Sequence, residues 1–433
     1  MFARSVSDQA MWDAIMAEPE NDAPRLVYAD ALQQRGEPLG EFIAVQCHPD
    51  FARTPALIAR SRQLYEANVA RWTAEVGISD VNLSFDRGLP HLVRVPFTRE
   101  ALAIVERVPV RWVRVHALYG PAPDEAIAIT RVIAGDARLA RVSTISTWGD
   151  DACAQLLIES PHFVASRLIV EPGGCTDRFA SALAGMSLPR LEKLSFGGNR
   201  STLGDAGIAA ISSSALKLRV LGLSHLPVTG RALEALAETK LPLEGLGITF
   251  AGDVNAGLHH FAASATFARL STLTLACGQV DDRAFAALVG RTDAALTDLD
   301  VSLNKLSSAS IDALRVGGLP KLDTLNLGDM EFDPQSLAAF AAAPRFGALR
   351  DLNVRRACKG PELAVAIASS PHAKGLRQLD LSHCLGRDEA AFALASSESL
   401  RELERLNFFR NKPTHAGRKA LHDRFGDKLL IED

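Results

Sequence analysis

A short apolar pattern returns at a nearly constant step along the last two thirds of the chain. It reads L-x-x-L-x-L, and clear copies begin at residues 191, 218, 243, 270, 296, 322, 349, 376 and 403. A weaker copy begins at residue 165 and a degenerate one at residue 139, so that the copies follow one another every 25 to 27 residues. Alternation of apolar and polar residues predicts a short β-strand with one buried face in each copy.

A second apolar position lies eighteen residues after the start of every copy. These positions are Leu157, Leu183, Ala209, Leu236, Phe261, Leu288, Leu314, Phe340, Ile367, Leu394 and Leu421. The residues around them, as in GRALEALAET and DDRAFAALVG, favour an amphipathic helix. Each unit is therefore predicted to contain a strand, a turn and a helix. One unit cannot bury its own apolar face, but stacked units bury it continuously, which predicts an elongated repeat array.

This pattern resembles the leucine-rich repeat family, and the 25–27-residue step is most similar to the ribonuclease-inhibitor-like subclass. The resemblance implies an α/β solenoid with a parallel β-sheet on its concave face and helices on its convex face. The family's turn asparagine is found as Asn199, Asn304 and Asn411. It is replaced in other copies, for example by Leu226, Ala251 and Cys384.

The N-terminal region has a different composition, because all four tryptophans and all three tyrosines lie within the first 148 residues. Residues 7–47 are predicted to be helical. We expect Ser7 to cap the first helix and Asp22 to cap the second, with Pro24 in its first turn. Gly36 is expected to end that second helix in the left-handed conformation. Residues 55–76 are predicted to form a further helix, and strands are expected around 92–95 and 112–117.

The string DAPRLVYADALQQRGEPLGEFIAVQ resembles a bacterial module that accompanies repeat arrays, the repeat-companion domain. The matching residues are Asp22, Pro24, Arg25, Leu26, Tyr28, Ala29, Asp30, Leu32, Arg35, Gly36, Gly40, Glu41 and Phe42. Ala31 stands where the family usually has tryptophan. The resemblance implies no enzymatic activity, and we interpret Arg25 and Asp30 as a structural ion pair.

These observations predict three regions. Residues 1–76 form a small α-helical domain that caps the array, and residues 77–138 form its irregular first turns. Residues 139–433 form a solenoid of about 11 repeats that ends in a C-terminal cap. In that cap, a short last strand, LLI, is edged by Lys428, Glu432 and Asp433, which discourage further stacking.

Charge and composition limit the classes of partner and the compartment that we expect for this chain. A net charge of −4 and a pI near 6.3 favour neither a nucleic-acid nor a membrane partner. The first twenty residues carry acids early and lack an apolar stretch, so we expect no secretory signal. Six scattered cysteines are interpreted as reduced thiols, which suits the cytoplasm of a bacterium.

Motifs for catalysis are not found in the sequence. There is no GxGxxG, GxxxxGK[ST], HExxH or GxSxG. His259–His260 is interpreted as part of a surface helix, the Ser224–His225 dipeptide as structural, and Cys384 beside His383 as a structural thiol. We expect no enzyme, no cofactor and no metal site.

The surface of the predicted sheet then remains as the candidate for function. Side chains at the third, fifth and seventh places of each unit should point to the concave face, and in the later units they are largely polar. The candidate partner-binding residues are Asp298, Asp300, Asn326, Asp351, Asn353, Arg355, Asp380, Arg405, Asn407 and Phe409. This set can be a solvated face or a binding face, and the sequence alone favours neither.

We therefore expect a monomeric interaction scaffold that binds a protein or peptide with basic or amide-rich contact residues. Two alternatives stay open. The chain can regulate an enzyme, for example as a GTPase activator, an analogy that rests on architecture alone. In the second, the N-terminal helical module carries the recognition and the array is a spacer.

Overall fold

The computed structural model describes residues 6–18, 21–51, 54–76, 83–96, 98–107, 112–116, 123–148, 150–171 and 174–432. The chain divides into two compact units, Met1–Gly173 and Gly174–Asp433.

Helices dominate the beginning of the first unit. They are α1 (Val6–Ala17), α2 (Ala23–Gln34), α3 (Pro38–Gln46) and α4 (Pro55–Val76). The predicted helix at 55–76 is thereby confirmed. Pro24 lies in the first turn of α2, and Gly36 follows this helix with φ of +72°, both as expected. Ser7 lies inside α1 and so does not precede it as a cap.

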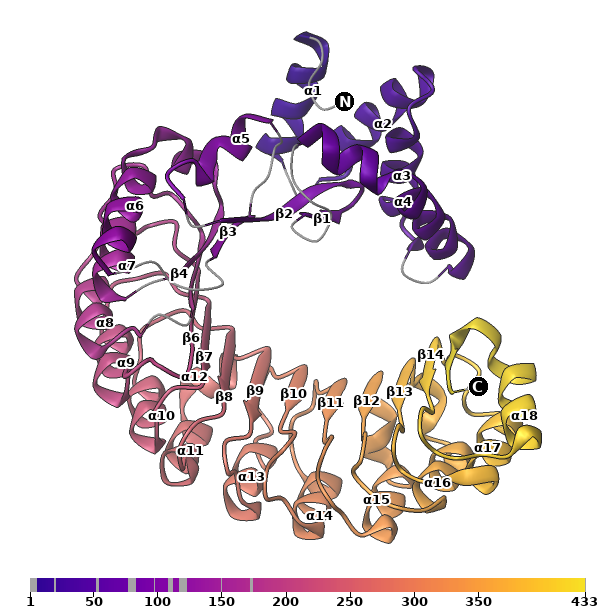
Figure 1. Ribbon diagram of the computed structural model, residues 1–433. Coiled ribbons are helices and arrows are strands. Elements are labelled where there is room, and N and C mark those ends of the chain that lie inside the picture. The colour runs from indigo at the N-terminus through magenta and orange to yellow at the C-terminus, as the bar shows by residue number, and fades with distance from the viewer. Residues whose placement is uncertain are drawn as a thin grey trace. The chain divides into compact units, whose positions relative to one another are not determined.

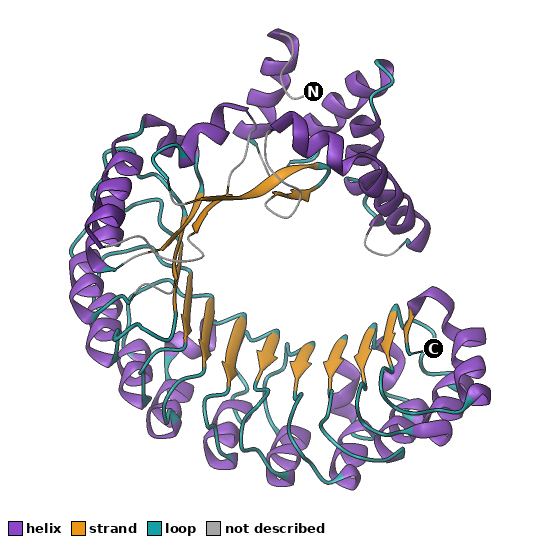
Figure 2. Cartoon of the chain, in the orientation of Figure 1, coloured by secondary structure: helices purple, strands orange, loops and turns teal. Residues whose placement is uncertain are grey.

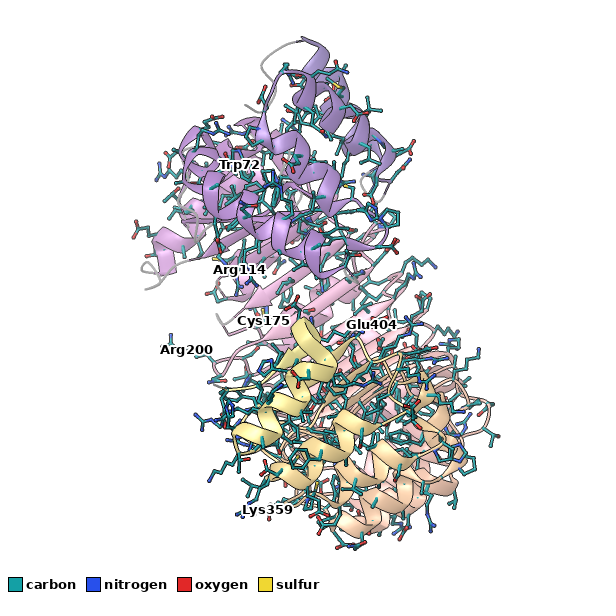
Figure 3. The ribbon with its side chains drawn as sticks, turned by 90° about the vertical axis from the view of Figure 1, so that its right-hand side faces the viewer. Trp72, Arg114, Cys175, Arg200, Lys359 and Glu404 are labelled. Carbon is teal, nitrogen blue, oxygen red and sulfur yellow. The ribbon has the colours of Figure 1, made fainter. Side chains whose placement is uncertain are left out.

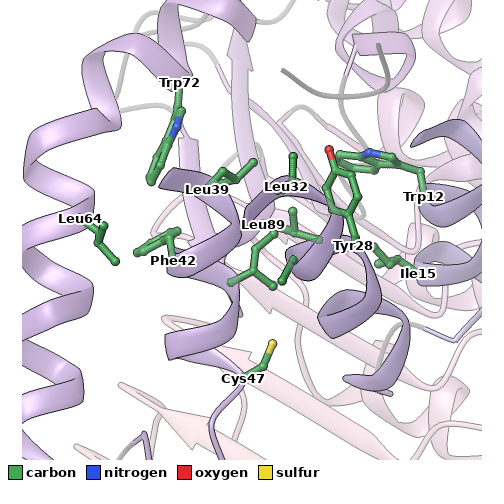
Figure 4. Close-up of a cluster of buried hydrophobic side chains, with 12 residues drawn as sticks. Trp12, Ile15, Tyr28, Leu32, Leu39, Phe42, Cys47, Leu64, Trp72 and Leu89 are labelled. Carbon is green, nitrogen blue, oxygen red and sulfur yellow. The ribbon is translucent and has the colours of Figure 1, made fainter. Parts of the chain in front are cut away.

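A hydrophobic core that contains several aromatic rings joins these helices to the hairpin that follows them (Figure 4). The ring of Trp12 meets Tyr28 edge-on at 5.6 Å, and Phe42 packs on Trp72 at 5.0 Å. Phe85, on the hairpin, lies 6.0 Å from Phe42. Rings of this size bury large apolar areas, so this core belongs to the first unit and does not depend on the repeat pattern.

Two expected contacts in this region are wrong. The carboxylate of Asp22 does not cap α2 and instead lies 3.1 Å from the guanidinium of Arg87. Asn21 takes the capping role, because its side-chain oxygen accepts from the backbone N–H of Ala23 at 3.0 Å. Arg25 is buried and donates to the carbonyl of Asn21 at 3.1 Å, whereas Asp30 is exposed. The predicted Arg25–Asp30 pair is therefore replaced by contacts to the turn before the helix.

The described residues of the first unit contribute five strands to the sheet. They are β1 (Leu83–Asp86), β2 (Leu89–Pro96), β3 (Trp112–His116), β4 (Thr144–Trp148) and β5 (Arg167–Glu171). β1 and β2 form an antiparallel hairpin, and β2 to β5 run parallel. The strands predicted around 92–95 and 112–117 correspond to β2 and β3, except that residue 117 lies outside the described residues. Gly88 turns the hairpin with φ of +77°, where a Cβ atom would overlap the backbone of Ile43.

Further helices connect these strands. They are η3 (Ala101–Ala103), α5 (Ile104–Arg107), α6 (Pro123–Gly135), η4 (Ala137–Arg141) and α7 (Asp151–Ile158). The strand and the helix of the predicted copy at 139 correspond to β4 and α7.

The second unit repeats a strand, a turn and a helix (Figures 1 and 2). Its strands are β6 (Lys193–Gly197), β7 (Val220–Ser224), β8 (Gly245–Thr249), β9 (Thr272–Ala276), β10 (Asp298–Asp300), β11 (Thr324–Asn326), β12 (Asp351–Asn353), β13 (Gln378–Asp380), β14 (Arg405–Asn407) and β15 (Leu429–Leu430). All neighbouring pairs in this sheet are parallel and in register.

Helices cover one face of this sheet and leave the other, concave face open (Figure 2). They are α8 (Asp177–Ala184), α9 (Asp205–Ser212), α10 (Gly230–Ala237), α11 (Asn255–Ala263), α12 (Ala265–Arg269), α13 (Asp282–Val289), α14 (Ser308–Val316), α15 (Pro334–Ala341), η5 (Pro344–Ala348), α16 (Glu362–Ser369), η6 (Ala373–Gly375), α17 (Arg387–Ser396), α18 (His415–Phe425) and η7 (Gly426–Lys428). The leucines of the strand pattern are buried, as are ten of the eleven second apolar positions, with Ala209 half-buried. The predicted leucine-rich-repeat solenoid of class α/β is confirmed.

Side-chain hydrogen bonds link successive repeats. The side-chain oxygen of Asn304 accepts from the backbone N–H groups of Gly278 and Val280 in the preceding repeat, both at 3.0 Å. Asn411 does the same for Gly386 at 3.0 Å, and its amide donates to the carbonyl of Leu381. These side chains satisfy backbone groups that would otherwise be buried without partners, which fixes the turn between the strand and the helix.

Candidate functional site

The candidate residues form two rows on the concave face of β10 to β14. Asp298, Thr324, Asp351, Gln378 and Arg405 are register partners in one row, and Asp300, Asn326, Asn353, Asp380 and Asn407 in the other. In each strand these side chains are half-buried or exposed, while the leucine between them is buried. The structure therefore brings the predicted third-place and fifth-place residues together on one face.

The fifth-place row carries out a structural task. In each repeat its side-chain oxygen accepts from the backbone N–H two residues later, at 2.8 to 3.2 Å. These acceptor and donor pairs are Asp300 with Ser302, Asn326 with Gly328, Asn353 with Arg355, Asp380 with Ser382 and Asn407 with Phe409. Such a contact is an Asx turn, which aspartate and asparagine form at the end of a strand.

Two cross-strand hydrogen bonds join members of this row. The amide of Asn326 donates to Asp300 at 2.9 Å, and the amide of Asn407 donates to Asp380 at 2.7 Å. Each of these carboxylates thus uses one oxygen for its own turn and the other for the next strand. Asp298 and Asp300 are only two residues apart, but these contacts belong to Asp300, which stabilises the sheet.

The Asx turns coincide with a change in strand length. The strands β6 to β9 contain five residues each, and β10 to β14 contain three. In the earlier repeats the fifth place is Ser195, Gly222, Gly247 or Thr274, and the seventh place still belongs to the strand. In the later repeats the seventh N–H is bonded to the Asx side chain, and the strand ends sooner.

Asp351 has an unusual electrostatic environment in the third-place row. Burial raises the pKa of its carboxyl group, and the carboxylates of Asp298, Asp323 and Asp380 act in the same direction. Arg405 opposes this rise in pKa. Asp298 accepts a hydrogen bond from Thr297 at 2.5 Å. This part of the concave face is therefore acidic, with one cation at its side.

A hollow lies at the C-terminal end of the same face. It is lined by Arg355, Ser382, His383, Asn407, Phe409, Leu429, Leu430 and Ile431. Phe409 and Leu430 are 40% and 53% exposed, so that two large apolar side chains line the hollow together. They are close neighbours because the backbone N–H of Phe408 donates to the carbonyl of Leu430 at 2.8 Å. The ring of His383 lies 6.2 Å from the ring of Phe409.

Three predicted residues, Arg355, Asn407 and Phe409, meet in this hollow. His383 was not predicted as part of this face, because it was interpreted only as a neighbour of Cys384. Leu430 was not predicted either, although the predicted terminal strand contained a usable signal. Alternation along LLI puts Leu429 and Leu430 on opposite faces, and Leu429 is buried while Leu430 is exposed.

The other residues considered for chemistry have structural contacts. His260 lies 2.9 Å from Glu238 on the helix surface, and the ring of His225 stacks on Phe250 at 4.1 Å. The thiol of Cys384 donates to the carbonyl of Val354 at 3.2 Å. Within the described ranges, no group of three histidine, cysteine or acidic side chains is arranged to hold a metal ion. No helix in those same ranges is both long and apolar enough to cross a membrane.

No family model matches this sequence, and no curated protein matches it. Among solved structures, the chain is similar to the Rad7 and Elc1 complex of yeast, at 16% identity and a TM-score of 0.42, over 71% of this chain and 88% of that one. It is similar to a TLR13 complex with ssRNA13 at 15% identity and a TM-score of 0.41, over 75% of this chain and 42% of that one. An internalin, InlF of Listeria monocytogenes, matches at 15% identity and a TM-score of 0.39, over 73% and 86%. All three TM-scores lie below 0.5, so these likenesses support no statement about function.

Proposed function

We propose that this chain is a non-enzymatic interaction scaffold that binds a protein or peptide on the concave face of its later repeats. The observation that carries this proposal is the exposed apolar pair, Phe409 and Leu430, in a hollow at the end of that face. Binding energy in protein interfaces is concentrated in a few aromatic and apolar anchors that fill such hollows. The partner is therefore expected to insert an apolar side chain here.

Polar groups beside the hollow would set the orientation of the partner. Arg355 lines the hollow, and Asp329 is the one carboxylate within ion-pair distance of it among the described residues, at 4.0 Å. Further along the face, Asp351 lies in register two strands from Asp298, about 10 Å away at the usual strand spacing. A cationic or amide side chain of the partner between these carboxylates would relieve their repulsion. The partner is thus expected to carry an apolar anchor followed by basic or amide-rich residues.

We further propose that the chain belongs to the ribonuclease-inhibitor-like subclass and that residues 1–76 are a repeat-companion domain that caps the array. The support for the cap is the packing of α1 to α4 on the β1–β2 hairpin, which covers the first strands of that sheet. A monomeric protein in the cytoplasm suits this arrangement, and free cysteines that are mostly buried agree with a reducing compartment.

Affinity capture from the cells that make this protein tests the proposal. The full chain is compared with Phe409→Ser, with Asp351→Lys and with the matched control Phe392→Ser. Phe392 is 47% exposed on α17, on the helical side of the sheet. We expect a reproducible partner that is retained by Phe392→Ser and reduced at least tenfold by each concave-face change. Capture that all four proteins share equally would contradict the proposal.

A further inference from the structure

A second groove lies outside the concave face, on the loops that lead from the strands to the helices. It is formed by the last four repeats, which begin at residues 322, 349, 376 and 403. Its apolar walls come from Phe332, Pro334, Cys358 and Leu385. Phe332 and Cys358 are buried, so that they form a floor, while Pro334 and Leu385 are half-buried. The groove can thus accept an apolar side chain.

Cationic side chains surround this apolar floor. They are Arg356, Lys359, Arg410 and Lys412, all of them exposed, and Glu331 is the one carboxylate that lines the groove with them. Lys359 projects from the surface of the second unit (Figure 3). The groove is therefore strongly positive although the whole chain carries a net charge of −4.

The ion pairs leave part of this positive charge without a partner. Lys359 pairs with Glu331 at 2.7 Å, and Arg356 lies 3.4 Å from Asp329. The carboxylate of Glu432 accepts from the backbone N–H of Arg410 at 3.1 Å, but among the described residues no carboxylate lies within ion-pair distance of the side chains of Arg410 or Lys412. The guanidinium of Arg410 instead lies over the ring of Phe409 at 5.7 Å. Two cations at one end of the groove are thus available to a ligand.

The backbone that presents these side chains is unusual. Arg356, His383 and Arg410 occupy the same place in successive repeats, and their φ values are +53°, +61° and +56°. Leu385 and Lys412 are also left-handed, with φ of +57°. Residues other than glycine seldom adopt this conformation. The stacked repeats hold it at five of the positions that line the groove.

We propose that this groove binds an acidic peptide segment of a partner protein, with one apolar residue on the floor and carboxylates at Arg410 and Lys412. Charge complementarity and the apolar floor favour this occupant over a nucleic acid. Single-stranded nucleic acids need flat aromatic surfaces on which bases stack, whereas Phe332 is buried and His383 is the only partly exposed ring that lines the groove among the described residues. The proposal concerns another surface than the concave-face hollow, although His383 touches both.

The test is a selection of heptapeptides from a random phage-displayed library on the full chain. The library is first depleted on the double variant Arg410→Glu with Lys412→Glu, so that peptides for other surfaces are removed. We expect the recovered peptides to be rich in aspartate and glutamate and to contain a large apolar residue. Their affinity, measured by fluorescence polarisation, is expected to fall at least tenfold in the double variant and in its milder form, Arg410→Gln with Lys412→Gln.

Matched controls separate this groove from other effects. Arg231→Glu reverses one charge on the exposed side of α10, and Asp351→Lys alters the concave face; both are expected to leave the affinity unchanged. Thermal unfolding of each variant shows whether it folds. A labelled ten-nucleotide oligouridine is the nucleic-acid arm. Peptides without acidic enrichment, no recovered peptides, equal binding to the Gln variant, or tighter binding of oligouridine than of the selected peptides would overturn the proposal.

The pKa of His383 gives an independent measurement of binding. A purely structural role of the arginines would not make this pKa change when the peptide is added. Burial lowers the pKa of the His383 imidazole, and the nearby Arg356, Arg355 and Arg410 act in the same direction, against Asp329. Carboxylates of a bound peptide would favour the protonated ring. An NMR titration of His383 is therefore expected to show a higher pKa with the selected peptide than without it, and an unchanged value would count against binding in this groove.

Discussion

The side-chain amide of Asn407 donates a hydrogen bond of 2.7 Å to Asp380, whose other carboxylate oxygen accepts from the backbone N–H of Ser382 at 2.8 Å. One carboxylate thus ends its own strand and binds the next one. Because each contact involves a charged acceptor, it is worth more than a neutral hydrogen bond.

Replacing this carboxylate should destabilise the solenoid. We expect Asp380→Ala to lower the free energy of unfolding by about 2 kcal/mol, since it removes both contacts. Asp380→Asn should cost less, because its oxygen can still accept from Ser382. Urea denaturation measures both values. The control Asp312→Ala, on the exposed surface of α14, should change the stability by less than about 0.5 kcal/mol. Equal effects for Asp380→Ala and Asp312→Ala would show that the turn contributes nothing.

The turn asparagines should contribute different amounts to the free energy of unfolding, although they occupy the same place in their repeats. Asn411 is fully buried and bonded to backbone groups of the preceding repeat and to the carbonyl of Phe408 in its own repeat. Asn199 is exposed. We expect Asn411→Ala to cost about 2 to 3 kcal/mol, because buried N–H and carbonyl groups lose their partners, and Asn199→Ala to cost almost nothing. Thermal and urea unfolding of both variants check this, and similar losses would refute the explanation.

Close backbone packing between helices should require two glycines. A Cβ atom on Gly257 would overlap the carbonyl of Gly230 in the preceding helix. We expect Gly257→Ala to destabilise the chain by about 3 kcal/mol, because α10 and α11 must move apart. Gly135, at the end of α6, has open space around its Cβ position. Gly135→Ala is therefore expected to be neutral or slightly stabilising, and denaturation of the two variants gives a direct comparison.

Two aspartates should respond to pH in opposite ways. The pKa of Asp351 is raised in the folded protein, so its ionisation reduces stability as the pH rises above its ordinary value of 3.8. Asp351→Asn should then be more stable than the wild type at pH 7 and equal to it below pH 3.8.

For Asp282, burial disfavours the charge, but hydrogen bonds from Ser307 and Ser310 prevail and lower its pKa below 3.8. Its contribution is present above that value and is lost as the pH falls through the folded pKa. Asp282→Asn should therefore be less stable than the wild type at pH 7, with the difference shrinking in acid. Stability curves from pH 2 to pH 8 test both signs, and two differences of the same sign would contradict the account.

The repeat architecture could be predicted because two sets of apolar positions, one in the strands and one in the helices, recur along the sequence. Residues such as Leu299 and Leu314 recur at fixed spacing, and each is buried in the way that its place in the unit requires. The N-terminal helices could also be predicted, from proline and glycine signals at Pro24 and Gly36. Their ion pairs could not, since Asp22 binds Arg87, which lies 65 residues later. Local sequence gives no information on such a contact.

The candidate face was predicted only in part, for a physical reason. Alternation tells which side chains point to the concave face, and so it found Asp300, Asp380 and Phe409. It does not tell which of them already have hydrogen-bond partners. Asp300 and Asp380 are occupied by turns and by neighbouring amides, whereas Phe409 is exposed. The basic groove at Arg410 and Lys412 escaped notice because it follows a left-handed turn, where strand alternation no longer holds.

Site-specific photo-crosslinking tests the central claim most directly. A benzophenone-bearing amino acid is placed at Phe409 in one protein and at Phe392 in another, and both are irradiated in the cells that make the chain. Both positions are aromatic and similarly exposed, but only Phe409 lies in the concave-face hollow. We expect a discrete crosslinked partner from position 409 and not from position 392. Equal adducts at both positions, or an adduct from position 392 alone, would contradict binding on the concave face.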